Sequence, residues 1–503
     1  MKFWNTLTSN NRPNSISDSS WQIVTFITLT ACSLTAASVI YIYTNARDPK
    51  ASISPQSKRF PRAARRPISK LASNKTHHSE QQPRFIYKYV KSADSPMSAD
   101  HRTTSAVKST AIQYLNNPNA CYPFTVGETE DSDEFDDIKS VVLALCSDWK
   151  NALKDEIQVK IVSGGITNQL YRLIWMDKSL LVRIYGENTE ILIDRQTENE
   201  IFAKLSREGF APTYYGRFKN GRIEGWLNAD PLEPEDMQQI EPVPLVKYVA
   251  KEVGKMHSMQ LDIDRTPVLW KKLNQFVQLA MEVHFSEPEK QNALNQLNLA
   301  LWSRKVSWVQ SFLSPDIACT MSTSSQVGKI DSITKEANKF AMDVVFCHND
   351  LLSGNILYNN AWKRVQIIDY EYGAYNFRAF DIANHFCEYC GFDLDLSQYP
   401  MLDQQSRFFD AYLVTAAPEL YERLHLHNHE KSFHKAFYEM INKFAMASHV
   451  FWAFWAIVQA RYSKIDFDFL NYAQKRFQAF DQQRKLLSFD GLTHSGSNHS
   501  IQS

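Results

Sequence analysis

Hydrophobic and polar positions follow two different periods in the middle of this chain. Apolar residues recur with a helical period over residues 138–153, which predicts the first helix of a folded domain. Residues 157–185 alternate between apolar and polar side chains around a Gly-Gly pair, which is typical of a β-hairpin. A helix over residues 189–206 and two strands within residues 212–227, joined at Asn220-Gly221, complete a small sheet-rich part.

The part that follows is predicted to be mainly helical. Apolar residues with helical spacing occupy residues 245–257, a long stretch over residues 274–312 and a final run over residues 407–480. Residues 314–339 are polar and rich in Ser and Thr, so we expect a mobile insertion there. The chain therefore combines a small sheet-rich lobe with a larger helical lobe.

One N-terminal segment is long and apolar enough to cross a membrane. Residues 21–43 carry no charge over 23 positions, and a helix needs roughly 20 residues to span a bilayer. We expect a single-pass anchor, and a cleaved signal peptide is the alternative because residues 35–38 are small. Basic residues are more frequent after the segment than before it, which places the folded part in the cytosol.

A second apolar stretch, residues 440–458, is interrupted by Lys443 and His449, which favours a core helix over a second span. Ser, Pro, Lys and Arg dominate the region between the anchor and the folded part, which indicates a linker. The expected segments are a tail (1–20), a membrane segment (21–43), a disordered linker (44–120), an N-lobe (121–232), a C-lobe (233–485) and a disordered tail (486–503).

Composition excludes some classes of function. The chain has 503 residues, with 55 Lys and Arg against 55 Asp and Glu, so no overall positive field favours nucleic acid. Seven cysteines, an odd number, indicate free thiols in a reducing compartment. Cys387 and Cys390 form one C-x-x-C close to His385, but structural zinc needs four ligands. Buried thiols are therefore expected instead of a zinc site.

The candidate chemistry lies between residues 346 and 372. His348, Asp350 and Asn355 form an H-x-D-x-x-x-x-N motif, and a predicted hairpin returns Asp369 to the same place. Phosphoryl transfer needs a group that orients a hydroxyl and oxygen ligands that hold magnesium. We therefore expect Asp350 to accept the hydroxyl proton and Asn355 and Asp369 to bind Mg²⁺. A loop-capping role for Asp350 is the simpler alternative.

Upstream residues suit the phosphates of ATP. A Gly-Gly turn between strands lets main-chain N–H groups approach phosphate oxygens, although it also occurs as an ordinary tight turn. Arg183 on the next strand is placed to contact the α- and β-phosphates, and Glu198 on the following helix to hold it, with a surface ion pair as the alternative. The expected nucleotide-binding turn consists of Ser163, Gly164, Gly165, Ile166, Thr167 and Asn168.

Six sequence blocks resemble the choline/ethanolamine kinases, in the same order and over about residues 160–482: SGGITN, LVRIYG, IDRQTE, CHNDLLSGNIL, IDYEYGAYNFRAFDIANHFCEY and HVFWAFWAIVQAR. The resemblance implies a protein-kinase-like bilobal fold, ATP and Mg²⁺ as cofactors, and phosphorylation of an amino alcohol. It also implies that Asp381 anchors the catalytic loop.

The same resemblance assigns an amine pocket, which consists of Tyr372, Glu388, Trp452, Trp455 and Tyr472. Trp452 and Trp455 are three residues apart and share one helix face. Indole faces attract cations, and Glu388 would supply the counter-charge. Without the upstream motifs, both tryptophans would be interpreted as ordinary core residues.

The amine itself is not decided by physical reasoning, because the pocket offers both aromatic faces for choline and acceptors for ethanolamine. Leu351-Leu352 and residues 395–400 resemble ethanolamine kinases, whereas Phe469 replaces a tyrosine common in choline kinases. We expect an ethanolamine kinase that makes phosphoethanolamine for phospholipid synthesis. A choline or dual-specificity kinase and a membrane-anchored pseudokinase scaffold are the alternatives, and a homodimer is an open alternative to a monomer.

Overall fold

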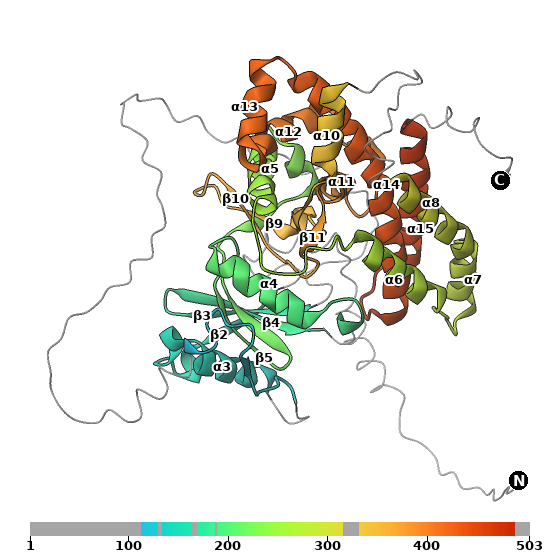
Figure 1. The fold of residues 1–503 in the computed structure, drawn as a ribbon. Coiled ribbons are helices and arrows are strands. Elements are labelled where there is room, and N and C mark those ends of the chain that lie inside the picture. Colours follow the sequence, from blue (N-terminus) through green and yellow to red (C-terminus); the bar gives the residue numbers. More distant parts are fainter. Residues whose placement is uncertain (1–111, 129–132, 163–167, 187–188, 315–330, 488–503) are drawn as a thin grey trace, which may run out of the picture.

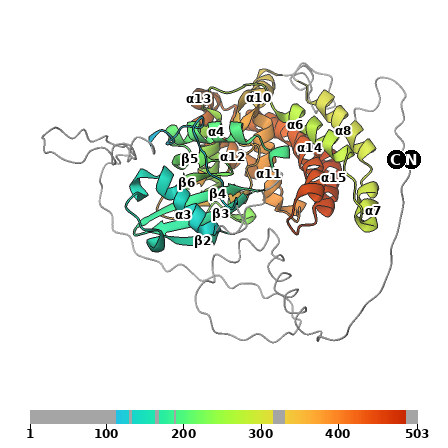
Figure 2. The ribbon, with the colours of Figure 1, turned by 90° about the horizontal axis from the view of Figure 1, so that it is seen from below.

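The structure, a computed structural model, describes residues 112–128, 133–162, 168–186, 189–314 and 331–487. The predicted membrane segment, nearly all of the linker, the C-terminal tail from residue 488 and residues 163–167 of the glycine turn lie outside the described residues. The described chain forms a sheet-rich lobe and a helical lobe (Figures 1 and 2).

The small lobe is built on a six-stranded sheet with the order β1-β5-β6-β4-β3-β2. Helices α3 (Glu134–Leu145) and α4 (Arg195–Arg207) cover its two faces (Figure 1). The strands of this sheet are β1 (Cys121–Tyr122), β2 (Gln158–Val162), β3 (Asn168–Trp175), β4 (Lys178–Tyr185), β5 (Tyr214–Phe218) and β6 (Gly221–Gly225).

Alternation along β4 decides which residues reach the active site. Leu180 and Val182 are buried in a core cluster with the apolar residues of α3. Because successive side chains of a strand point to opposite faces, Arg183 points toward α4 and the large lobe. A single strand thus contributes apolar side chains to the small core on one face and the cation of Arg183 to the side of the large lobe on the other.

Two small sheets lie where the lobes meet. Strand β7 pairs with β9, β9 pairs with β10, and β11 pairs with β8, all antiparallel. The hairpin predicted after Asn355 is therefore confirmed. The strands are β7 (Asp230–Pro231), β8 (Val344–Cys347), β9 (Ile356–Tyr358), β10 (Val365–Ile367) and β11 (Ala374–Phe377).

The large lobe packs around α14 (Glu430–Tyr462). Among the described residues, this helix alone has the length and composition to cross a membrane, and its apolar window is fully buried inside the protein. The core helix predicted for residues 440–458 is confirmed. The other helices are α5 (Leu245–His257), α6 (Leu269–Met281), α7 (Pro288–Gln296), α8 (Leu299–Phe312), α10 (Ser332–Met342), α11 (Arg378–Cys387), α12 (Leu402–Ala416), α13 (Pro418–Leu426) and α15 (Phe469–Leu486).

Several sequence-based boundaries need correction, among them the end of the first helix, which is Leu145 and not residue 153, and the start of the second, which is Arg195 and not residue 189. Helix α3 starts four residues before the predicted residue 138, because Asp133 caps it and acidic side chains favour the first turn of a helix. The long stretch 274–312 belongs to three helices. The insertion predicted for 314–339 is wrong for residues 332–339, which lie in α10 with Asp331 as its N-cap.

Five described cysteines are free, and Cys387 and Cys390 are buried as predicted.

Candidate active site

One buried aspartate holds the loop that follows β8. Asp381 accepts hydrogen bonds from the main-chain nitrogens of His348 (3.0 Å) and Asn349 (2.6 Å). Its Oδ2 also lies 3.0 Å from Nε2 of His257. Asn349 has a left-handed backbone (φ 65°), a conformation that Asn adopts more readily than most residues. The predicted anchoring of this loop by Asp381 is confirmed.

Asp350, Asn355 and Asp369 come together beside the β9–β10 hairpin. Asn355 Nδ2 donates to the main-chain oxygen of Asp350 at 2.9 Å and lies 3.4 Å from its Oδ2. The main-chain nitrogen of Ile368 donates to the main-chain oxygen of Asn355 at 3.0 Å, which holds the neighbouring Asp369 close to the loop. Asp369 is left-handed (φ 63°), a strained geometry that clusters at functional sites.

Negative charge accumulates around Asp350. Burial, followed by the charges of Glu388 and Glu371, raises the pKa of Asp350 well above its ordinary value. Burial and the adjacent Asp369 raise the pKa of Glu371 to about 7. Because like charges at close range disfavour ionisation and a cation reverses this effect, the site is suited to positively charged ligands.

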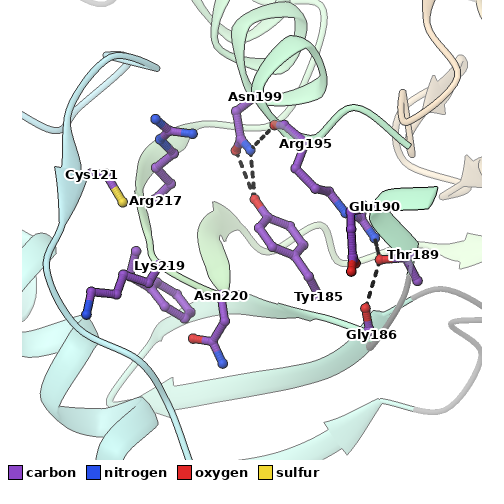
Figure 3. A pocket seen from close by; sticks show the side chains of 11 residues that line it. Cys121, Tyr185, Gly186, Thr189, Glu190, Arg195, Asn199, Arg217, Lys219 and Asn220 are labelled. Atoms are coloured by element: carbon purple, nitrogen blue, oxygen red, sulfur yellow. Dashed lines mark hydrogen bonds between the residues drawn. The ribbon is translucent and has the colours of Figure 1, made fainter. Parts of the chain in front are cut away.

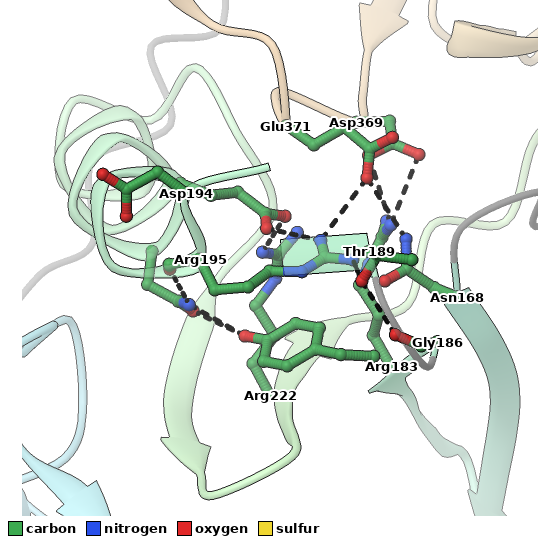
Figure 4. A network of polar contacts seen from close by, with 12 residues as sticks. Asn168, Arg183, Gly186, Thr189, Asp194, Arg195, Arg222, Asp369 and Glu371 are labelled. Carbon is green, nitrogen blue, oxygen red and sulfur yellow. Dashed lines mark hydrogen bonds and ion pairs between the residues drawn. The ribbon is translucent and has the colours of Figure 1, made fainter. Parts of the chain in front are cut away.

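Arg183 joins the small lobe to these carboxylates (Figure 4). Its Nε lies 3.0 Å from Glu224 Oε1, and its Nη1 lies 3.2 Å from Asp369 Oδ1. Both carboxylates raise the pKa of Arg183 against the opposing effect of burial. The cation predicted on β4 therefore faces Asp369 across the lobes.

The expected pairing of Arg183 with Glu198 is wrong. Glu198 forms ion pairs with Arg222 and with Arg195, the latter at 2.7 Å. Arg222 is the register partner of Arg183 on β6, so the two guanidinium groups share the space next to α4. Burial opposes the charge of Glu198, but Arg222 and Arg195 outweigh it and lower its pKa to about 2.

Sequence reasoning missed several members of this network, of which Arg222 is fully buried. The available signal was the alternation of charged residues along β6, where Arg222 and Glu224 occupy every second position. Asn168, the described member of the nucleotide-binding turn, donates from Nδ2 to Glu371 Oε2 at 3.3 Å.

The oxygen donors of the site fit magnesium. Glu198, Asp369 and Glu371 each offer an oxygen within 4.8 Å of the others. Arginines already hold Glu198. Asn355 uses its Nδ2 toward Asp350, so its Oδ1 can face a metal. Because Mg²⁺ prefers a few protein oxygens and keeps waters and phosphate oxygens, Asp369 and Asn355 form a suitable donor set.

Tyr372, Trp452 and Trp455 form one aromatic group. The rings of Tyr372 and Trp452 lie 5.5 Å apart, and those of Trp452 and Trp455 lie 5.3 Å apart. Trp455 Nε1 donates to the hydroxyl of Tyr372 at 2.9 Å, and Trp452 Nε1 donates to Asn384 Oδ1 at 2.6 Å. These hydrogen bonds fix the orientation of both indoles.

Glu388, the acidic member of the predicted pocket, already has a cationic partner. Arg476 on α15 forms an ion pair with Glu388 through Nη2, and its Nε donates to the hydroxyl of Tyr472 at 2.8 Å. The structure therefore joins Glu388 and Tyr472 through an arginine that sequence reasoning missed. Both residues, like Tyr372 of the aromatic group, are close enough to Asp350 for the charges to interact. The spacing in the sequence could have indicated this arginine, because Arg476 lies one helical turn after Tyr472 and shares its helix face.

Comparisons with known proteins show which family the chain is similar to. The model of the choline/ethanolamine kinase family matches residues 159–481. A probable ethanolamine kinase of Arabidopsis thaliana is 34% identical over 354 residues, which cover 69% of this chain and 85% of that protein. Human ethanolamine kinase 2 is 33% identical over 356 residues, covering 69% and 81% of the two chains.

The fold is also similar to a solved structure. The Plasmodium vivax ethanolamine kinase superposes with a TM-score of 0.57 and 25% identity, covering 76% of this chain and 95% of that one. The kinase-like fold with a β-sheet lobe and a helical lobe, expected from the sequence, is confirmed. Family match, sequence identity and fold all agree, and this chain belongs to the choline/ethanolamine kinase family.

Proposed function

We propose that this chain transfers the γ-phosphate of ATP to the hydroxyl of ethanolamine and so produces phosphoethanolamine. The position of Asp350 carries the proposal. Asn355 contacts its carboxylate at 3.4 Å, Asp369 lies beside them, and Glu388 of the aromatic pocket is close enough to raise its pKa. An alcohol held by the pocket would thus present its hydroxyl next to the phosphate-binding side.

The roles of the residues follow from this geometry. Asp350 accepts the hydroxyl proton as the oxygen attacks phosphorus. Arg183 supplies positive charge to the phosphates from the small lobe. Asn355 and Asp369 would hold Mg²⁺, which neutralises phosphate charge when bound. The raised pKa of the Asp350 carboxyl would fall once the cationic substrate lies nearby, so the base is ionised when it is needed.

Recognition of the amine depends on more than Glu388. Because Arg476 neutralises that carboxylate, the ion pair by itself attracts an ammonium weakly. The faces of Tyr372, Trp452 and Trp455 attract the cation, by about 0.5 to 2 kcal/mol for each well-placed ring. The remaining electrostatic attraction for the ammonium comes from the carboxylates around Asp350.

Radiolabelled phosphate transfer by the purified full chain tests the proposal. We expect kcat/KM for ethanolamine to exceed that for choline at least tenfold, and Asp350→Asn to lower the rate of transfer by about 10²- to 10⁴-fold. Asp403→Asn, an exposed change outside the site, serves as the matched control. Faster turnover of choline would contradict the choice of amine, and transfer that survives Asp350→Asn unchanged would support the pseudokinase alternative.

We also propose that residues 21–43 anchor the kinase to a membrane with its catalytic lobes in the cytosol. The uncharged length of the segment and the basic residues after it support this topology. Membrane fractions should retain the full chain after alkaline carbonate washing, and deletion of residues 21–43 should release it. A mature N-terminus that begins after this segment would show a cleaved signal peptide instead.

A further inference from the structure

The small lobe contains a cavity that the reaction described above does not use. It has a volume of about 350 Å³, within the range of roughly 300 to 1,000 Å³ found for small-molecule sites. The cavity lies between the end of β4, the start of α4, β1 and the β5–β6 turn (Figure 3). Asp350, Asn355 and Asp369 are not among its lining residues.

Two cations in this cavity lack a carboxylate partner. Within the described residues, neither Arg217 nor Lys219 forms an ion pair, and Nε of Arg217 is buried without a hydrogen-bond acceptor. Buried N–H donors in folded proteins almost always have an acceptor. Arg217 on β5 and Lys219 just after it are two residues apart and both line the cavity. Guanidinium and ammonium groups both bind the oxygens of a phosphate group.

Among the described residues that line the cavity, Glu190 is the carboxylate, and it lies across the cavity from these cations. Figure 3 shows Glu190 on the opposite side from Arg217 and Lys219, with the ring of Tyr185 between them. Glu190 is exposed, so it can meet a cationic group that enters from solvent. Arg195 also lines the cavity but is paired with Glu198. Within the described part of the chain, the unpaired charges of the cavity are therefore the cations of Arg217 and Lys219 on one side and Glu190 on the other. This arrangement complements a ligand that carries a phosphate dianion at one end and an ammonium at the other.

The cavity is connected to the catalytic carboxylates by one side chain. Arg195 lines the cavity, and its guanidinium lies 4.5 Å from the centre of the Tyr185 ring. Its Nη1 lies 2.7 Å from Glu198 and 3.5 Å from Glu371. A ligand that moves Arg195 would therefore change the charge around Glu371.

From these observations we propose that the cavity binds a phosphomonoester of an amino alcohol at a site separate from the nucleotide. Arg217 and Lys219 bind the phosphate, Glu190 binds the ammonium, and Arg195 transmits occupancy to the active site. This ligand class includes the product of the proposed reaction. Occupancy of the cavity would then report product concentration to the active site as feedback, and this interpretation rests on the proposed function.

Calorimetric titration of the full chain with phosphoethanolamine tests the site. The protein is first saturated with Mg²⁺ and a non-hydrolysable ATP analogue, whose γ-phosphate excludes a product phosphate from the catalytic site. We expect one binding event to remain, and the double variant R217A/K219A to weaken it at least tenfold. The matched control R207A/K247A removes two exposed cations elsewhere and should leave the affinity unchanged.

Two further arms identify the ligand class. Glu190→Gln should weaken phosphoethanolamine binding at least threefold while leaving the weaker binding of inorganic phosphate unchanged. Absence of binding to the analogue-saturated wild type, or affinity that R217A/K219A does not alter, would overturn the site. Equal affinity for inorganic phosphate, with no effect of Glu190→Gln, would overturn the ligand class. Because these titrations need no turnover, a failure of the proposed function would appear separately, in the transfer assay.

Discussion

Replacing Arg476 with Met removes the cationic partner of Glu388. Arg476 is fully buried, and its guanidinium contacts Glu388, the hydroxyl of Tyr472 and, at 3.4 Å, Nδ1 of His449. Glu388 is only 6% exposed. Methionine fills much of the same volume but carries no charge, so the variant leaves Glu388 buried beside Asp350 without its cationic partner.

The expected loss of stability is large. Breaking a buried ion pair by removing one partner costs about 3 to 5 kcal/mol, because the remaining charge stays out of water. For a folded domain of this size, that loss corresponds to a fall in Tm of roughly 4 to 7 °C. Ethanolamine should recover part of it, since its ammonium can take the place of the guanidinium and ligand binding to the native state adds stability.

Thermal unfolding with and without saturating ethanolamine measures both effects. Lys485→Met on the same helix changes an exposed cation and should alter stability by less than about 0.5 kcal/mol. The double variant E388Q/R476M, which removes both charges, should be more stable than R476M. A Tm for R476M equal to that of the wild type would refute the argument that Arg476 compensates Glu388.

Three further predictions concern residues in and around the candidate site. Asp350→Asn should lower kcat by about 10²- to 10⁴-fold, which is the usual contribution of a general base, and should not lower Tm. An unchanged kcat would show that Asp350 is not the base. Trp455→Leu should raise the KM for ethanolamine by roughly 2- to 30-fold through loss of a cation–π contact, whereas an effect on the KM for ATP alone would place the amine elsewhere. The pKa of Glu371 is raised to about 7 in the folded state. Protonated Glu371 therefore costs the folded state nothing at pH values below the pKa of an unfolded glutamate, whereas its ionisation at higher pH disfavours folding. Stability of the ligand-free protein should therefore fall as pH rises from about 4.3 through about 7, and urea unfolding of Glu371→Gln should lack this part of the pH dependence.

The sequence by itself determined the elements and motifs whose physics is local. Helix α5 begins and ends at the predicted residues 245 and 257, because apolar residues at helical spacing form a continuous face. The hairpin after Asn355 depends on a few residues that are close in the chain, so its pattern predicted how Asp369 returns to Asp350. For motifs of this length, the spacing of the residues in the sequence is enough to predict which side chains come together.

Only the tertiary structure decided which charges pair. Register across the sheet places Arg222 opposite Arg183 and gives Glu198 a partner that no local pattern indicated. Packing of both α11 and α15 against α14 brings Arg476 to Glu388, which is 88 residues away in the chain. Electrostatic partners are chosen by distance in space and by shared burial, and neither quantity can be read from separation along the chain.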